Sequence, residues 1–133
     1  MTPLLADREM HNAACEAVIG AAIEVHRTLG PGLLESAYTA CLDHELSLRK
    51  VQFQREIPIH VSYKGRLLEH GYRADFLIDD LVVVEVKSAD CIADIHRAQL
   101  LTYLRLMDRR LGLIINFNVQ ALYRGIRRVV NGL

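Results

Sequence analysis

The sequence predicts one domain of the α/β class (α+β), in which a mixed sheet is flanked by helices. Apolar residues at helical spacing fill the first third of the chain, and alternating or β-branched segments dominate the middle. A further helical segment then separates two predicted strands. The chain has 133 residues, 51% of them hydrophobic. It therefore has the size and apolar content of a single compact domain over residues 1–133.

The chain is expected to form three helices and at least four strands. Clean alternation over residues 51–63 predicts a half-buried antiparallel strand, and Pro58 places it at a sheet edge or beside a bulge. Gly71 is typical of a bulge in the next strand segment. The tail stays open, because residues 126–130 fit either a helix or a short strand. The remaining expected elements are helices over about residues 6–29, 33–48 and 93–108, and strands over residues 66–78, 81–87 and 111–117.

Composition excludes several classes of protein. No apolar run is long enough to span a membrane, and the start of the chain lacks the basic-then-apolar pattern of a signal peptide. The three cysteines lie far apart and lack zinc-type spacing. We therefore expect a cytoplasmic protein that does not bind membranes.

The strongest functional signal is Asp75 followed by Glu85-Val86-Lys87 on two predicted strands joined by a turn. A loop with an odd number of residues, centred on Asp80, would place Asp75 opposite Glu85 in an antiparallel hairpin. A two-residue loop would shift the register and separate the two carboxylates. Glu85 and Lys87 share a face, because side chains alternate along a strand. The chemistry therefore predicts the odd loop.

An acidic pair beside a lysine is suited to metal-assisted hydrolysis of a phosphodiester. The carboxylates would bind a divalent cation, and Lys87 could position water and offset negative charge. Oxygen ligands favour Mg²⁺, or Mn²⁺, over Zn²⁺. Without a cation the carboxylates would repel each other, which raises the pKa of at least one. For the tripeptide alone, an ordinary strand end with a surface salt bridge is the alternative.

Two helical motifs accompany this hairpin. Glu35 and Tyr38 are three residues apart at the start of the second helix, where Glu35 could also be a first-turn glutamate and Tyr38 a core aromatic. Gln99 and Tyr103 are four residues apart and share a face of the third helix. They could also be a solvated glutamine and a half-buried tyrosine. For His96, in the first turn of that helix, a surface or capping role is expected.

The order Gly32-x-x-Glu35-x-x-Tyr38, Asp75, Glu85-x-Lys87 and Gln99-x-x-x-Tyr103 resembles the small bacterial "GxxExxY" proteins of the PD-(D/E)XK nuclease superfamily. The resemblance covers about residues 19–133. It implies a restriction-endonuclease-like core of helix, three antiparallel strands, helix and strand. Ala74 stands where the superfamily name has proline, a replacement that leaves the neighbouring ligand intact.

The resemblance also implies roles for individual residues. Asp75, Glu85 and the main-chain carbonyl of Val86 would bind the metal, and Glu35 would complete the acidic site from its helix. Lys87 would position the attacking water. Gln99 and Tyr103 match the extra motif of the RecB-type exonuclease branch, where these residues support the substrate and the site.

Charge is distributed unevenly along this neutral chain. Residues 1–96 hold 9 Lys plus Arg against 15 Asp plus Glu, whereas residues 97–133 hold 7 Arg against one acid, Asp108. Arginine is suited to bidentate contacts with phosphate, so the basic third could form a nucleic-acid track beside the acidic site. A solvated face that balances the acidic part is the alternative. Candidate nucleic-acid contacts are Arg97, Arg105 and Arg109.

The sequence thus predicts a Mg²⁺-dependent nuclease acting on DNA, with RNA as the other candidate substrate. The second hypothesis is a non-catalytic nucleic-acid-binding or protein-interaction module that retains the nuclease fold. The intact set of Asp75, Glu85 and Lys87 argues for the enzyme. No separate target-recognition domain is present in the sequence, so specificity would come from a homodimer or a partner protein.

Overall fold

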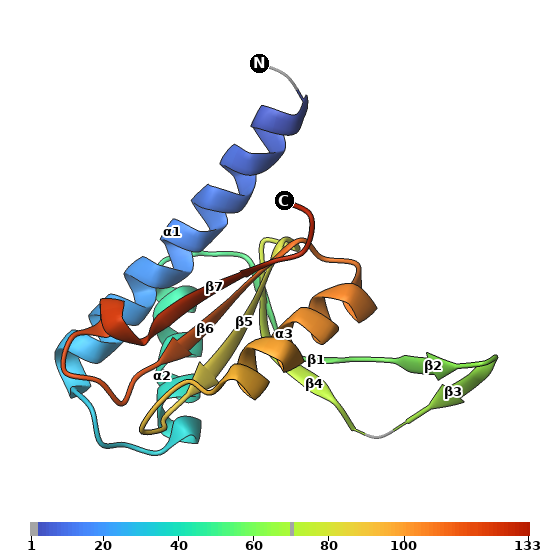
Figure 1. The fold of residues 1–133 in the computed structure, drawn as a ribbon. Helices are drawn as coiled ribbons and strands as arrows, with labels where there is room; N and C mark the ends of the chain where they lie inside the picture. The colour runs from blue at the N-terminus through green and yellow to red at the C-terminus, as the bar shows by residue number, and fades with distance from the viewer. Residues whose placement is uncertain (1–2, 70) are drawn as a thin grey trace.

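The computed structural model describes residues 3–69 and 71–133, and it has the predicted architecture of a mixed sheet flanked by helices (Figure 1). The helices are α1 (Pro3–Leu29), α2 (Glu35–Leu48) and α3 (Asp94–Met107), with a short 3₁₀ helix η1 (Leu122–Gly125). The strands are β1 (Phe53–Pro58), β2 (Val61–Tyr63), β3 (Arg66–Leu68), β4 (Arg73–Ile78), β5 (Val82–Lys87), β6 (Leu111–Asn116) and β7 (Ile126–Val130).

The main sheet has the strand order β1-β4-β5-β6-β7. Strands β5 and β6 are parallel and are connected through α3, and the other neighbours in the sheet are antiparallel. Ile78 pairs with Val82, so the loop between β4 and β5 has three residues centred on Asp80. The predicted odd loop is therefore confirmed. Pro58 ends the edge strand β1, where its missing amide interrupts no ladder.

The structure differs from the predicted elements in two places. Residues 51–63 form two strands instead of one, and β2 pairs with β3 in a two-stranded arm that projects from the sheet (Figure 1). Gly71 lies in the connection from this arm to β4, with a φ of 72°, and not in a bulge within a strand. Alternation predicts extended backbone but does not indicate where a strand leaves its sheet. In the tail, residues 126–130 form the strand β7.

Two apolar layers enclose the sheet. One face is covered by α1 and α2 and the other by α3. Strand β5 lies at the centre of the sheet and is buried on both faces, because Val84 and Val86 pack in the first layer and Val83 in the second. Glu85 alternates with these residues and lies on the α3 side with Val83. A carboxyl group therefore lies at the centre of the fold.

None of the helices in the described part of the chain has the length and hydropathy that a membrane crossing requires.

Candidate active site

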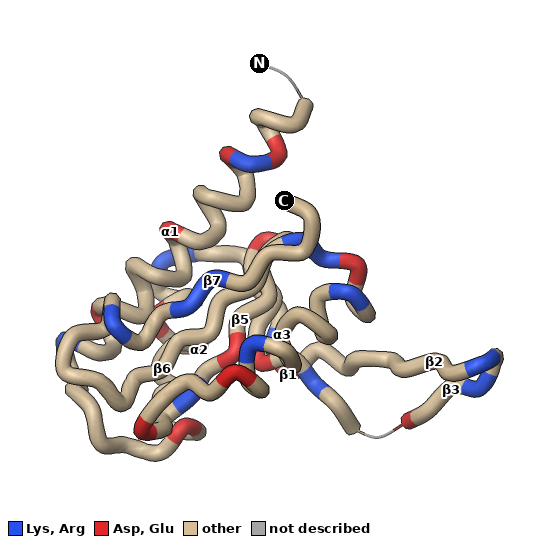
Figure 2. Tube along the Cα trace, in the orientation of Figure 1, with Lys and Arg blue, Asp and Glu red and all other residues tan. Residues whose placement is uncertain are grey.

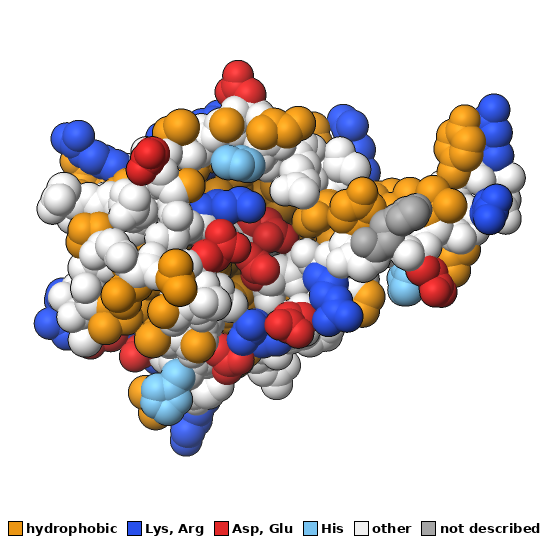
Figure 3. All heavy atoms as spheres, turned by 90° about the horizontal axis from the view of Figure 1, so that it is seen from below, with side chains coloured by type: hydrophobic (Ala, Val, Ile, Leu, Met, Phe, Trp, Pro, Cys, Tyr) orange, Lys and Arg blue, Asp and Glu red, His pale blue; other side chains and the backbone are white. Residues whose placement is uncertain are grey.

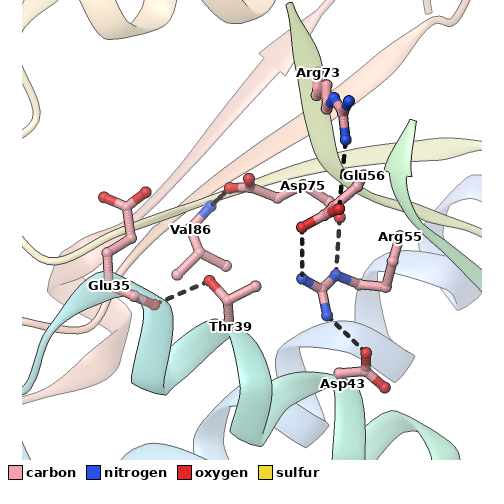
Figure 4. A network of polar contacts seen from close by, with 8 residues as sticks. All are labelled: Glu35, Thr39, Asp43, Arg55, Glu56, Arg73, Asp75 and Val86. Atoms are coloured by element: carbon pink, nitrogen blue, oxygen red, sulfur yellow. Dashed lines mark hydrogen bonds and ion pairs between the residues drawn. The ribbon is translucent and has the colours of Figure 1, made fainter. Parts of the chain in front are cut away.

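Asp75 and Glu85 lie next to each other at one end of the β4–β5 pair. Phe76 pairs with Val84, so the same register places Asp75 opposite Glu85. The regular backbone pairing of β4 with β5 ends at this point, and β5 instead forms a hydrogen bond with the side chain of Asp75. Its Oδ2 accepts a hydrogen bond from the backbone amide of Val86 at 2.8 Å (Figure 4). This bond holds the Asp75 carboxylate against β5.

Glu85 is the most perturbed ionisable group of the site. Only 9% of the residue is exposed. Burial, followed by the neighbouring charge of Asp75, raises the pKa of the Glu85 carboxyl to about 9. Its Oε1 is buried and has no hydrogen-bond partner. At neutral pH and without a cation, Glu85 therefore carries a proton.

This pair of residues fits a hard divalent cation. A buried oxygen without a partner is costly, and a cation bound between two carboxylates would both satisfy it and relieve their repulsion. Within residues 3–69 and 71–133, no three His, Cys, Asp or Glu side chains lie close enough to hold a metal ion together. Asp75 and Glu85 are therefore a pair of carboxylates that could share a cation, and main-chain oxygens such as that of Val86 are further candidate ligands.

Lys87 lies at the end of β5 on the same face as Glu85, and its charge opposes the rise in the pKa of Glu85. It lines a groove of about 750 Å³ along α3. Figure 3 shows acidic side chains gathered beside a basic one in a hollow, with hydrophobic side chains extending from there toward the arm.

Gln99 and Tyr103 line the same groove, so the structure brings them together with Lys87. Gln99 Nε2 donates a hydrogen bond to the Tyr103 hydroxyl at 3.1 Å. Burial raises the pKa of Tyr103, and the charge of Glu85 adds to this effect. His96 Nδ1 accepts a hydrogen bond from the amide of Ala93 at 3.1 Å, which is the capping role expected for it.

Tyr38 is a fully buried residue that fixes the turn before α2. Its hydroxyl donates to the carbonyl of Gly30 at 2.5 Å and accepts from the amide of Leu33 at 3.1 Å. Its ring stacks on Phe117 with the centroids 4.6 Å apart. Ser88 Oγ donates to the Leu33 carbonyl at 2.6 Å, which ties the same turn to the chain just after β5. The motif tyrosine thus positions the first turn of α2.

Glu35 occupies that first turn and is exposed. Figure 4 shows its carboxylate rising from α2 on the side where the Asp75 carboxylate lies. The contacts of the described residues include no hydrogen bond or ion pair of its side chain, and it does not form a three-carboxylate group with Asp75 and Glu85. Its role as a ligand stays a prediction.

The candidate arginines are dispersed. Arg97 and Arg105 are exposed on α3. Arg109 donates to Asp80 at 2.7 Å, at the loop between β4 and β5 and therefore at the opposite end of these strands from Asp75. Figure 2 shows other basic positions along β7 and at the tip of the arm. The arginines after residue 96 do not form one continuous track.

Sequence reasoning missed Arg55. Its Nη1 donates to Asp43 of α2 at 2.6 Å, and its Nε donates to the backbone carbonyl of Asp75 at 3.3 Å (Figure 4). Its guanidinium lies 4.7 Å from the centre of the Phe76 ring. Arg55 therefore connects α2 to the strand that carries the site. The sequence does contain a signal for this residue, because Arg55 is the one charged residue at the odd, otherwise apolar positions of residues 51–63.

Comparison with known proteins identifies a family for this arrangement. The sequence model of the PD-(D/E)XK nuclease superfamily matches residues 12–129, which include most of α1, all of α2, the acidic pair and α3. No curated protein sequence matches the chain. The match extends over most of the chain.

Proposed function

Because the chain belongs to the PD-(D/E)XK nuclease superfamily, we propose that it is a metal-dependent nuclease that hydrolyses phosphodiester bonds of DNA. The observation that carries this proposal is the buried, unpartnered carboxyl oxygen of Glu85 beside Asp75. A fold gains nothing from a protonated glutamate at the centre of its sheet, so its presence there favours a functional role. RNA is the other candidate substrate.

The cation would be Mg²⁺, or Mn²⁺, held by the carboxylates of Asp75 and Glu85 and the carbonyl of Val86. When bound, it supplies Lewis acidity to the scissile phosphate and lowers the pKa of water. Asp75 is oriented for this by the Val86 amide, and Glu85 must release its proton first. The sequence motifs of the GxxExxY proteins would add Glu35 to the acidic site.

Lys87 would act on the reaction from the groove side. Its ammonium group can hold the attacking water as a hydrogen-bond donor and offset the negative charge that develops on the phosphate. Gln99 and Tyr103, which are hydrogen-bonded to each other on α3, would support the substrate where it passes Lys87.

The protein would act in the cytoplasm, and a second copy or a partner protein would supply specificity.

A cleavage assay tests this function. Purified protein is incubated with single-stranded, duplex and branched DNA and with RNA, in Mg²⁺, in Mn²⁺ and in EDTA. We expect cleavage that requires the cation. Binding without cleavage of any of these substrates would instead favour a non-catalytic nucleic-acid-binding module.

A further inference from the structure

The groove beside Lys87 extends away from the carboxylates toward the β2–β3 arm. Its volume of about 750 Å³ lies within the range of ~300–1,000 Å³ that holds organic ligands. Lys87 and Gln99 line it near the acidic pair, and Val61 and Tyr72 line it at the base of the arm. Apolar and aromatic side chains dominate its walls, so the groove is suited to flat, weakly polar groups.

The arm prolongs the same surface. Val61 lines the groove, and Tyr63 lies two residues further along β2, so both side chains project from one face of the arm. Tyr63 pairs with Arg66 of β3, and cross-strand partners share a face. The surface of the groove therefore continues onto the arm, where it is formed by the side chains of Val61, Tyr63 and Arg66. Figure 3 shows the corresponding band of hydrophobic side chains, which ends in basic ones.

Exposed aromatic rings lie along this surface, and cations lie at its two ends. Tyr72 is 45% exposed, and its ring lies 6.4 Å from that of the buried Tyr103. Tyr63 is 62% exposed, and the Lys64 ammonium lies 5.3 Å from the centre of its ring. Lys64 and Arg66 are exposed at the tip, and among the described residues neither forms a salt bridge.

We propose that the groove and the arm bind an unpaired, single-stranded segment of nucleic acid. Bases would stack on Tyr72 and Tyr63, and phosphates would contact Lys64 and Arg66. The inference rests on the proposed nuclease function, because the same strand would present its scissile phosphate to Asp75.

The choice of a single strand follows from the exposed rings. Bases inside a duplex have both faces covered by their neighbours, so a strand can stack successive bases on both Tyr72 and Tyr63 only where it is unpaired. Cations at one end of the surface and Lys87 at the other complement a phosphate backbone running between them. An apolar peptide would fill the groove but would leave the cations of the tip without partners.

A tryptophan at position 72 provides a direct probe, because the chain contains no tryptophan. The variant Tyr72→Trp is titrated in EDTA with a short oligothymidylate and with a blunt duplex of equal length. Stacking of a base on the indole should quench its fluorescence with the oligothymidylate. Equal or stronger quenching with the duplex would overturn the proposal.

Alanine variants measure how much each ring contributes. In fluorescence anisotropy with labelled oligothymidylate, Tyr72→Ala and Tyr63→Ala should each weaken binding about fivefold to a hundredfold, the range for the loss of one stacked base. Tyr72→Phe should bind like the wild type. The matched control is Tyr123→Ala, because Tyr123 is 71% exposed and carries Arg124 5.7 Å from its ring, away from the groove.

Unchanged affinity in folded Tyr72→Ala and Tyr63→Ala would contradict the proposal. Tyr63 lies on the exposed arm, so it remains a test if the Tyr72 variant fails to fold. Cleavage assays on the same variants separate the two proposals. Metal-dependent cleavage with unaltered binding in both variants would reject only the single-strand site, whereas tyrosine-dependent binding without cleavage would reject only the nuclease.

Discussion

The Asp75 carboxylate lies beside the buried carboxyl of Glu85, and the hydrogen bond from the Val86 amide holds it there. The two groups come from neighbouring antiparallel strands at the point where regular pairing ends. Burial and the charge of Asp75 raise the pKa of Glu85 to about 9.

Metal affinity should increase with pH. A cation must displace the proton of Glu85, so binding of Mg²⁺ or Mn²⁺ should strengthen from pH 6 to pH 9, by up to tenfold per pH unit. Isothermal titration calorimetry in several buffers would also detect the released proton. Glu85→Gln and Asp75→Ala should lose most of the affinity, whereas Glu69→Gln, an exposed control, should not. Affinity that is independent of pH would contradict the assignment of Glu85.

Stability without metal should decrease as pH rises. The unfolded chain releases the Glu85 proton near its ordinary pKa of 4.5, but the folded chain retains it up to about 9. The contribution of Glu85 is therefore fully favourable below pH 4.5 and is lost progressively between pH 4.5 and 9. Urea denaturation in EDTA should show a loss on the order of a few kcal/mol over this window.

The variant Glu85→Gln isolates this effect, because glutamine is neutral at every pH. It should flatten the decrease and stabilise the metal-free protein at pH 8, with Glu69→Gln again as the exposed control. A decrease of the same size in Glu85→Gln would show that another group causes it.

The hydroxyl of Tyr38 should be structural. Tyr38→Phe keeps the stacking on Phe117 but loses the hydrogen bonds with Gly30 and Leu33, which should cost about 1–3 kcal/mol of unfolding free energy. Chemical denaturation measures this cost. A Tyr38→Phe protein as stable as the wild type but inactive in cleavage would instead place the hydroxyl in the chemistry.

Substitution of Arg109 and substitution of Arg97 should affect the salt dependence of DNA binding differently. Arg109 is paired with Asp80 at the far end of the strands, so Arg109→Ala should lower stability and leave the salt dependence of DNA binding unchanged. Arg97 is exposed in the first turn of α3, next to the groove residue His96. Arg97→Ala should reduce the salt slope of binding by about one unit. Anisotropy titrations over a range of salt concentrations distinguish the two.

Much of the fold and of the acidic pair could be predicted, because these features depend on local pattern. The β-branched run of β5, the short loop at Asp80 and the alternation of side chains are sufficient to bring Asp75 opposite Glu85. The pairing of Gln99 with Tyr103 follows from helical spacing.

Features that depend on distant contacts could not be predicted. The pairing of Arg109 with Asp80 and the contacts of Arg55 with Asp43 and Asp75 join residues that no local pattern relates. The pattern also does not show that β2 and β3 leave the main sheet. The basic C-terminal third suggested one track, but net charge along a chain does not specify which side chains share a surface.

The most direct test compares the wild type with Lys87→Ala in cleavage, DNA binding and metal binding under the same conditions. The control is Lys50→Ala, at an exposed lysine in the loop after α2. Lys87→Ala should lose cleavage while keeping the cation and most of its DNA affinity, because Lys87 would supply only one of several phosphate contacts. Cleavage that persists unchanged in Lys87→Ala and in Asp75→Ala would contradict the proposed active site.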